Sequence, residues 1–156
     1  MLNKEGKYLT FSLGSQEYGI DILKIKEIIG MMPIRELPQA PHYIKGVINL
    51  RDKVIPVTDL RMKFGMESIE YTDRSCIIVL EFDMDDTAFF IGIAVDSVTE
   101  VLDIKAFEIE ETPSFGFNIN TGHILAIAKT KGGVKILLDI EQVLNIKKHE
   151  VLDVLL

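Results

Sequence analysis

The chain has 156 residues, a formal net charge of −7 at pH 7 and a single cysteine. Its longest apolar run, even with glycine counted, is residues 88–95, far shorter than the roughly 20 residues that a membrane helix needs, so we expect no direct membrane insertion. The acidic balance argues against binding to nucleic acid, whose phosphates attract a basic face. The lone cysteine cannot form an internal disulfide and the first residues hold no apolar signal segment, which together predict a cytoplasmic protein.

β-Branched residues dominate the composition. The chain has 22 Ile and 11 Val but only six Ala and no Trp. Because Ile and Val pack well on pleated surfaces and Ala is the best helix former, we predict a mainly β fold. The charge is divided unevenly, since residues 1–78 carry a net +1 and residues 79–156 a net −8. We therefore expect the two halves of the sequence to present different faces to partners.

Short alternating segments bounded by turn residues predict four β-hairpins. After the first hairpin, the spacing of Ile25, Ile28 and Ile29 suits either one helical turn or a second strand, and we favour a tight turn followed by a strand. Three prolines within residues 31–41 predict an extended loop, because proline has no N–H to donate to a sheet. For the same reason, Pro56 is expected at an edge or a bulge. The predicted hairpin strands are residues 8–13 with 18–22, 43–50 with 54–57, 76–82 with 88–95, and 124–128 with 134–138.

Two short helices are predicted beside these strands. Asp59 can cap a helix that runs to Phe64 and is closed by Gly65 in the left-handed conformation. Asp139 begins a capping-box pattern, so we expect a C-terminal helix from about residue 140 that covers an open end of the β structure.

Two blocks of the sequence repeat in the same order. Residues 18–29 align with residues 91–102 at an offset of 73, matching glycine with glycine and glutamate with glutamate. Residues 54–60 align with residues 134–140 at an offset of 80, and the extra residues fall in a loop-like stretch at 103–123. We interpret the chain as two copies of a small β module of five strands, which favours closed barrels because closure removes exposed edges.

The whole chain, residues 1–156, is expected to form one domain with two subdomains. We place the first at about residues 15–82 and the second at about residues 83–145, with the strand at 8–13 a candidate to cross into the second. Modules of about 70 residues are marginally stable alone, so they should share an apolar core. The apolar residues at 151–156 are expected to pack on this body.

No constellation in the sequence predicts catalysis or a cofactor. The three histidines are far apart, and none has metal-ligand spacing. Cys76 opens an apolar strand, where a thiol is expected to pack and not to react. The acidic run Asp83, Asp85 and Asp86 lacks the later glycine and glutamate of a calcium loop, so we expect a solvated turn. We therefore predict no catalytic residue, no metal site and no cofactor.

Three segments resemble a known family. They are residues 18–28 (Tyr-Gly-Ile-Asp-Ile-Leu-Lys-Ile-Lys-Glu-Ile), 44–51 (Ile-Lys-Gly-Val-Ile-Asn-Leu-Arg) and 54–64 (Val-Ile-Pro-Val-Thr-Asp-Leu-Arg-Met-Lys-Phe). These look like the hallmark segments of the CheW family of bacterial chemotaxis coupling proteins, and the resemblance extends over about residues 8–145. The regulatory domain of the kinase CheA and the CheV scaffold share much of this pattern. We expect the coupling protein, because 156 residues leave no room for the additional domains of the other two.

The resemblance implies a non-enzymatic adaptor made of two SH3-like five-stranded β-barrel subdomains around a shared hydrophobic core, in agreement with the repeat. Members of the family bind the cytoplasmic hairpin tip of methyl-accepting chemotaxis receptors in a groove between the barrels. They also bind the regulatory domain of the histidine kinase CheA. The implied location is therefore the cytoplasm, with recruitment to membrane-bound receptor arrays.

The resemblance also implies which residues make these contacts. A helical receptor tip is recognised by an apolar groove with a few polar anchors. Glu27 or Arg51 could fix the register, and the apolar surface could come from Ile25, Ile28, Val47 and Ile48. The chain departs from the family pattern at Asp52, where glycine is usual, and at Ile29, where arginine is frequent. Motif position assigns to the contacts Ile25, Glu27, Gly46 and Arg51. The full predicted receptor or kinase interface is Ile25, Glu27, Ile28, Gly46, Val47, Ile48, Asn49 and Arg51.

Other functions compete with this adaptor hypothesis. One is a regulatory or scaffold β-barrel module that binds another signalling protein. A weaker alternative is an oligonucleotide-binding barrel, which would need exposed aromatics beside a basic face, whereas Phe89 and Phe90 lie in an apolar strand of an acidic chain. An enzyme would need convergent titratable groups, and the sequence offers no pair that can be placed together.

Overall fold

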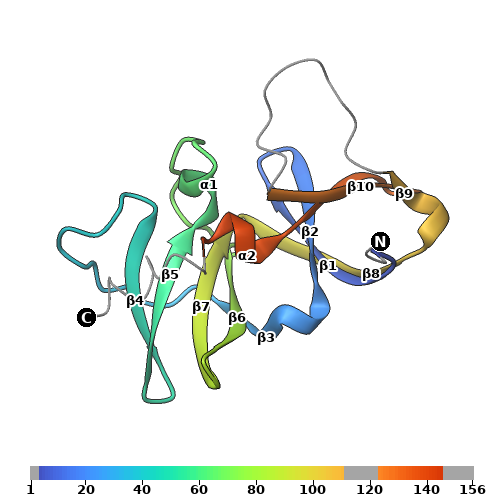
Figure 1. The fold of residues 1–156 in the computed structure, drawn as a ribbon. Coiled ribbons are helices and arrows are strands. Elements are labelled where there is room, and N and C mark those ends of the chain that lie inside the picture. Colours follow the sequence, from blue (N-terminus) through green and yellow to red (C-terminus); the bar gives the residue numbers. More distant parts are fainter. Residues whose placement is uncertain (1–3, 111–122, 146–156) are drawn as a thin grey trace. The chain divides into compact units, whose positions relative to one another are not determined.

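The computed structural model describes residues 4–110 and 123–145 and is built mainly of β-strands (Figure 1), which confirms the predicted fold class. The predicted tail at 151–156 and most of the predicted loop after residue 110 lie outside the described residues. The elements in chain order are β1 (Gly6–Leu13), β2 (Gln16–Asp21), η1 (Ile22–Lys24), β3 (Ile25–Gly30), β4 (Ile44–Leu50), β5 (Lys53–Asp59), α1 (Leu60–Lys63), β6 (Cys76–Met84), β7 (Thr87–Val95), β8 (Ser97–Ile104), η2 (Ala106–Glu108), β9 (Ile109–Glu110), β10 (Ile124–Thr130), β11 (Gly133–Leu138) and α2 (Ile140–Val143).

The chain divides into two compact units that do not follow the two halves of the sequence. We call residues 23–98 the central unit, and residues 4–22, 99–110 and 123–145 together the split unit. The expected boundary at residues 82 and 83 differs from this division, because it falls inside the β6–β7 hairpin, which is paired along its whole length. A boundary there would cut a continuous ladder of backbone hydrogen bonds.

Each unit holds one sheet, and each sheet includes the strand that follows a hairpin of the other sheet in the sequence. The central unit has the strand order β3-β6-β7-β5-β4, and the split unit has the order β8-β1-β2-β11-β10-β9. β3 follows β2 in the sequence but pairs with β6, and β8 follows β7 but lies beside β1. Apart from the two-residue β9, each sheet has the five strands that the repeat predicts.

The repeated blocks form matching structures in the two units. β5 runs parallel to β7 with Val57 opposite Gly92, and β11 runs parallel to β2 with Leu137 opposite Gly19. A Cβ on Gly19 would lie 2.9 Å from Leu137 Cδ2, and one on Gly92 would lie 2.8 Å from Ile77 Cγ2. The two glycines that align in the repeat therefore both leave room for a neighbouring side chain, which comes from the parallel neighbour β11 at Gly19 and from the hairpin partner β6 at Gly92.

All four predicted hairpins are present. Pro56, however, lies neither on an edge strand nor at a bulge, the two positions predicted for it. β5 lies between β7 and β4, so it is not an edge strand, and the irregularity in its pairing with β4 is at Ile44 and Gly46. Pairing between β5 and β7 begins only at Val57. Pro56, which has no N–H, thus occupies the position just before this parallel ladder starts.

Both predicted helix caps are confirmed. The Asp59 carboxylate accepts a hydrogen bond from Met62 N at 3.2 Å, and the Asp139 carboxylate accepts one from Gln142 N at 3.3 Å. Gly65 follows α1 with a φ of +77°, as the predicted C-terminal cap requires. The caps lie at equivalent places in the two units, each where a strand of the parallel pair runs into a helix.

Among the described residues, no helix has the length and apolar character that a membrane-spanning helix requires.

Each unit has a cluster of buried apolar residues. In the central unit the cluster is Ile48, Ile55, Val57, Ile77, Val79 and Ala94, and in the split unit it is Tyr8, Ile104, Ala126, Ala128 and Leu137.

The charge asymmetry of the sequence does not persist in the fold. Residues 23–98 carry nine basic and twelve acidic side chains, and the rest of the chain carries eight and twelve, so the net charges are −3 and −4. Net charge therefore does not distinguish the two units as it distinguishes the two halves of the sequence. The cause is the exchange of strands, which places the acidic residues of 79–98 in the unit that also holds most of the basic residues of the first half. These acidic residues are Glu81, Asp83, Asp85, Asp86 and Asp96.

Candidate interaction site

Arg51 lies at the tip of the β4–β5 hairpin. Leu50 pairs with Lys53, so Arg51 and Asp52 form a two-residue turn. Both have positive φ angles, +48° and +66°, as in the type I′ turn that suits the twist of a hairpin. Asn, Asp and Gly usually fill such positions, and an arginine there is uncommon. A strained backbone at a residue of this kind points to a functional role for its side chain.

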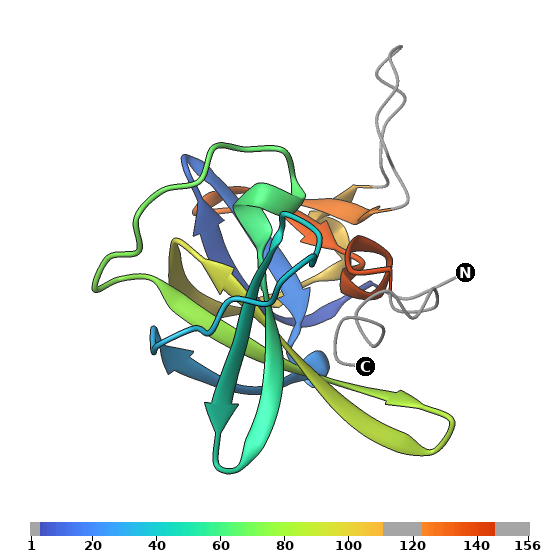
Figure 2. The same cartoon turned by 90° about the vertical axis from the view of Figure 1, so that its left-hand side faces the viewer.

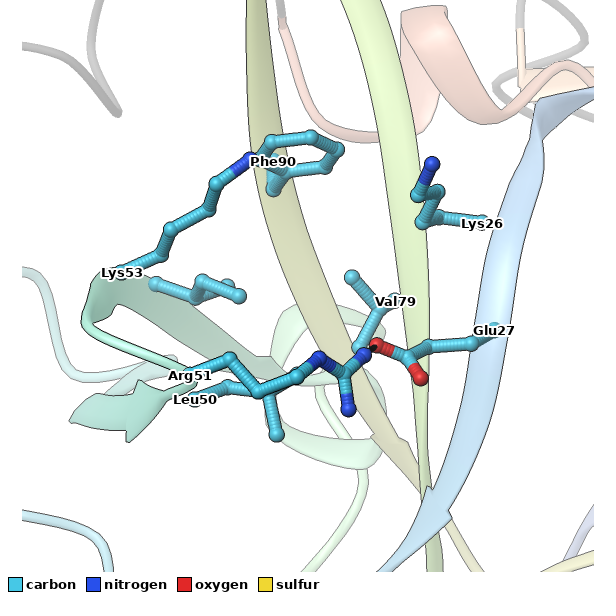
Figure 3. Close-up of a pocket in the computed structure, with 8 residues that line it drawn as sticks. Lys26, Glu27, Leu50, Arg51, Lys53, Val79 and Phe90 are labelled. Carbon is cyan, nitrogen blue, oxygen red and sulfur yellow. Dashed lines mark hydrogen bonds and ion pairs between the residues drawn. The ribbon is translucent and has the colours of Figure 1, made fainter.

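The Arg51 side chain is bound to Glu27 at this end of the central unit. Its guanidinium donates a hydrogen bond to the Glu27 carboxylate, and the two side chains are 68% and 28% exposed (Figure 3). The contact joins β3 to the β4–β5 turn, although β3 and β4 are at opposite ends of the sheet order. The sheet therefore curls until its two ends meet, as a barrel requires. An exposed ion pair contributes only about 0–1 kcal/mol, so its main effect is to orient the arginine.

A pocket with an apolar floor and a charged rim lies beside this ion pair (Figure 3). In the floor, Leu50 and Phe90 are half-buried, and Ile55 and Val79 are buried. The volume is about 90 Å³, several times what one water molecule needs. We call it the Arg51 pocket, and its lining residues are Lys26, Glu27, Leu50, Arg51, Lys53, Ile55, Val79 and Phe90.

Lys53 is fixed at the rim of the Arg51 pocket by an aromatic ring. Its Nζ lies 4.3 Å from the centroid of the Phe90 ring, within the range of a cation–π interaction. The turns of the β4–β5 and β6–β7 hairpins lie at the same end of the central unit (Figures 1 and 2). Lys53 and Phe90 come together because β5, which begins at Lys53, pairs with β7. The ring thereby holds a positive charge next to Arg51 without neutralising it.

A second surface forms where the proline-rich loop meets β4. Arg35 and Val47 exchange two backbone hydrogen bonds of 2.8 Å, and a Cβ on Gly46 would lie only 2.0 Å from the carbonyl oxygen of Arg35. Gly46 has a φ of +147°, so glycine is required both for the space and for the backbone conformation. We call the resulting pocket of about 570 Å³ the loop groove, and its lining residues are Pro33, Ile34, Arg35, Val47, Ile48, Asn49 and Val54.

The predicted interface residues fall into three groups. Ile28 is 42% exposed and Ile25 is half-buried, both on β3 and outside the two pockets. Gly46 is buried and Ile48 is only 1% exposed, so they shape the surface more than they present side chains to a partner. The remaining residues line the pockets: Glu27 and Arg51 in the Arg51 pocket, and Val47 and Asn49 in the loop groove.

The sequence prediction missed Lys26, Lys53 and Phe90. A local signal exists for Lys53, because a two-residue turn at Arg51 and Asp52 places it directly opposite Leu50. Alternation along β3 likewise exposes Lys26. No local signal exists for Phe90, because it approaches the hairpin tip only through the non-local pairing of β5 with β7.

A partly buried polar network anchors the segment that follows α1. The Arg61 guanidinium donates to both carboxylate oxygens of Asp96, at 2.8 and 2.9 Å. The Tyr71 hydroxyl donates to the buried Asp59 carboxylate at 2.9 Å. Burial and this hydrogen bond raise the pKa of Tyr71 above its ordinary value, so the hydroxyl stays protonated and able to donate. The network fixes the junction of β5 and α1 within the central unit.

The chemistry of these surfaces is that of recognition. Within the described ranges, no three His, Cys, Asp or Glu side chains come together as a metal site. The two pockets combine apolar surface with a few charged groups at the rim, an arrangement typical of protein–protein interfaces. The fold and the site thus define a mainly β protein-interaction module built from two related units.

Comparison with known proteins identifies the family. The sequence model of the CheW-like domain family matches residues 7–148 of this chain. Chemotaxis protein CheW of Klebsiella aerogenes is 36% identical over 147 residues, which cover 94% of this chain and 86% of that protein. Chemotaxis protein CheW of Rhizobium meliloti is 29% identical over 150 residues, which cover 96% and 94%. The chain therefore belongs to the CheW-like domain family.

A solved structure agrees with this assignment. The crystal structure of scaffolding protein TtCheW from Thermoanaerobacter tengcongensis is 35% identical, with a TM-score of 0.75 and coverage of 86% of this chain and 89% of that chain. The resemblance carried by the three motif segments is thus confirmed. The named relatives also support the predicted chemotaxis adaptor function.

Proposed function

We propose that this chain couples methyl-accepting chemotaxis receptors to the histidine kinase CheA, working in the cytoplasm at membrane-bound receptor arrays. Membership of the CheW-like family supports the adaptor class. The observation in the structure that carries the proposal is the Arg51 turn, where an exposed arginine is held at positive φ and oriented by Glu27. A charged side chain fixed in this way loses little further freedom when it binds a partner, which favours affinity.

In this proposal the predicted interface residues form one binding surface, and they contribute to binding in different ways. Arg51 and Glu27 provide the polar anchor, and Val47 and Asn49 provide contact area in the loop groove. Ile28 adds an exposed apolar side chain on β3. The buried Gly46 and Ile48, with the half-buried Ile25, keep the strands in the shape that a partner meets. The receptor groove that the resemblance implies between the barrels stays a prediction.

Co-sedimentation tests the proposed function. The purified chain is mixed with cytoplasmic fragments of a chemoreceptor, with the kinase, or with both, and kinase activity is measured with and without the chain. We expect the chain to sediment with the receptor fragments, to bring the kinase into the pellet and to change kinase activity. A chain that binds neither the receptor fragments nor the kinase would overturn the proposal.

A further inference from the structure

The rim of the Arg51 pocket concentrates positive charge on an acidic protein. Three of the nine basic residues within residues 23–98 line this one pocket: Lys26, Arg51 and Lys53. Arg51 is paired with Glu27, but no carboxylate of the described residues pairs with Lys26 or Lys53. The rim therefore carries a net charge of +2, and both lysines are available to a carboxylate from another molecule.

The floor of the same pocket determines what kind of side chain can bind there. Leu50 and Phe90 are partly exposed to the pocket, and the buried Ile55 and Val79 complete an apolar floor. A polar group on this floor would lose its hydration without gaining a partner, whereas an apolar side chain would gain contact area. The small volume restricts that side chain to about the size of one aliphatic residue.

From these two features we infer that the Arg51 pocket receives a protein segment in which one apolar side chain is flanked by carboxylates. The apolar side chain enters the floor, and the flanking Asp or Glu residues pair with Lys26 and Lys53. Charge complementarity of this kind increases the rate of association and selects against basic partners. The inference rests on the proposed function, because it describes the chemistry of the kinase or receptor segment bound there.

Charge reversal at the rim tests the electrostatic part. Dissociation constants are measured for the wild-type chain and for Lys26→Glu and Lys53→Glu, with the kinase regulatory domain and with the receptor tip fragment, at low and high salt. We expect both variants to bind the same partner, either the kinase regulatory domain or the receptor tip fragment, at least tenfold more weakly than the wild-type chain does. The wild-type affinity for that partner should fall as salt rises, because exposed charges are screened.

Two further variants separate the pocket from general charge effects. Arg74→Glu changes an exposed cation of the same unit that does not line the pocket, and it should leave both affinities within twofold of wild type. Lys53→Met keeps an apolar stem over Phe90 but removes the charge, so it should weaken binding by less than Lys53→Glu. Circular dichroism melting of each variant checks that the fold is kept.

A photo-reactive amino acid in place of Lys26 then identifies the occupant. We expect the cross-linked partner peptide to contain an aliphatic residue with Asp or Glu within two positions. A cross-linked peptide without carboxylates, or rim variants that bind both partners as tightly as wild type, would overturn the pocket inference while leaving the adaptor function intact. A wild-type chain that binds neither partner would overturn the function and the inference together.

Discussion

At the scale of single residues, Gly46 has the strictest requirement in the site. Its Cβ would overlap the backbone of Arg35, and its φ of +147° is unfavourable for any other residue. We therefore expect Gly46→Ala to lower the free energy of unfolding by about 3 kcal/mol or more, since backbone on both sides leaves no flexible atom to move. Urea unfolding measures this loss.

Gly65 provides a matched control for Gly46. It also has a positive φ, but a Cβ there meets no atom within 4 Å. Gly65→Ala should therefore cost only the conformational part, about 1 kcal/mol. Equal losses in the two variants would show that the contact with Arg35 is not what requires glycine at position 46.

Arg51 differs from Gly46 because its importance is predicted for binding and not for folding. The side chain is 68% exposed and its ion pair is at the surface, so Arg51→Glu should change the free energy of unfolding by less than about 1 kcal/mol. The variant should nevertheless abolish ternary assembly with receptor and kinase in co-sedimentation, because it reverses the charge at the centre of the proposed site.

Glu27→Gln is the control that separates orientation from charge. It removes the ion pair with Arg51 but keeps a hydrogen-bond acceptor and leaves the arginine in place. Assembly should be weakened but retained. An Arg51→Glu chain that is unfolded by circular dichroism, or one that still assembles, would contradict the role given to this residue.

At the scale of elements, the two N-cap aspartates occupy equivalent places but differ in their hydrogen bonds and in their burial. Asp59 caps α1 and also accepts from the Tyr71 hydroxyl while only 2% exposed. Asp139 is half-buried and caps α2. We expect Asp139→Ala to cost about 1 kcal/mol and Asp59→Ala about 2–4 kcal/mol, because the latter also leaves the partly buried Tyr71 hydroxyl without its acceptor.

Urea denaturation of both cap variants, with Asp59→Asn as a control, checks this difference. Asparagine keeps an oxygen for the Met62 N–H or the Tyr71 hydroxyl, so it should cost less than alanine at position 59. A loss at Asp139→Ala as large as that at Asp59→Ala would mean that the bond to Tyr71 contributes nothing.

Elements set by local chemistry could be predicted from the sequence, and elements set by distant pairing could not. The hairpins follow from alternation and turn residues, and the caps follow from an aspartate before an apolar helix start. The position of Pro56 depends on where β5 begins to pair with β7, which no segment of the sequence shows alone. The Arg51 pocket was half predicted for the same reason, since Glu27 and Arg51 are in motifs whereas Phe90 reaches them only through the sheet.

At the scale of the whole molecule, the repeat was visible in the sequence but the exchange of strands was not. An alignment of residues 18–29 with residues 91–102 shows that the two segments are alike without showing that β3 and β8 each join the other sheet. This exchange moves the unit boundaries to residues 22 and 98 and evens out the net charges. The expected subdomains, about residues 15–82 and about residues 83–145 with the strand at 8–13 as a candidate to cross, therefore differ from these units in their boundaries.

The exchange of strands predicts which fragments of the chain can fold. Residues 23–98 contain every strand of the central sheet and its whole apolar cluster, although a chain of this size is only marginally stable. Residues 1–82 are longer but lack β7, the neighbour that β5 and β6 share, and also lack β11 beside β2. We expect the fragment 23–98 to show a β-type circular dichroism spectrum and cooperative thermal unfolding, and the fragment 1–82 to show neither. Cooperative folding of residues 1–82 together with an unfolded 23–98 would contradict the division, because it would mean that contiguous halves, and not the exchanged sheets, are the units of stability.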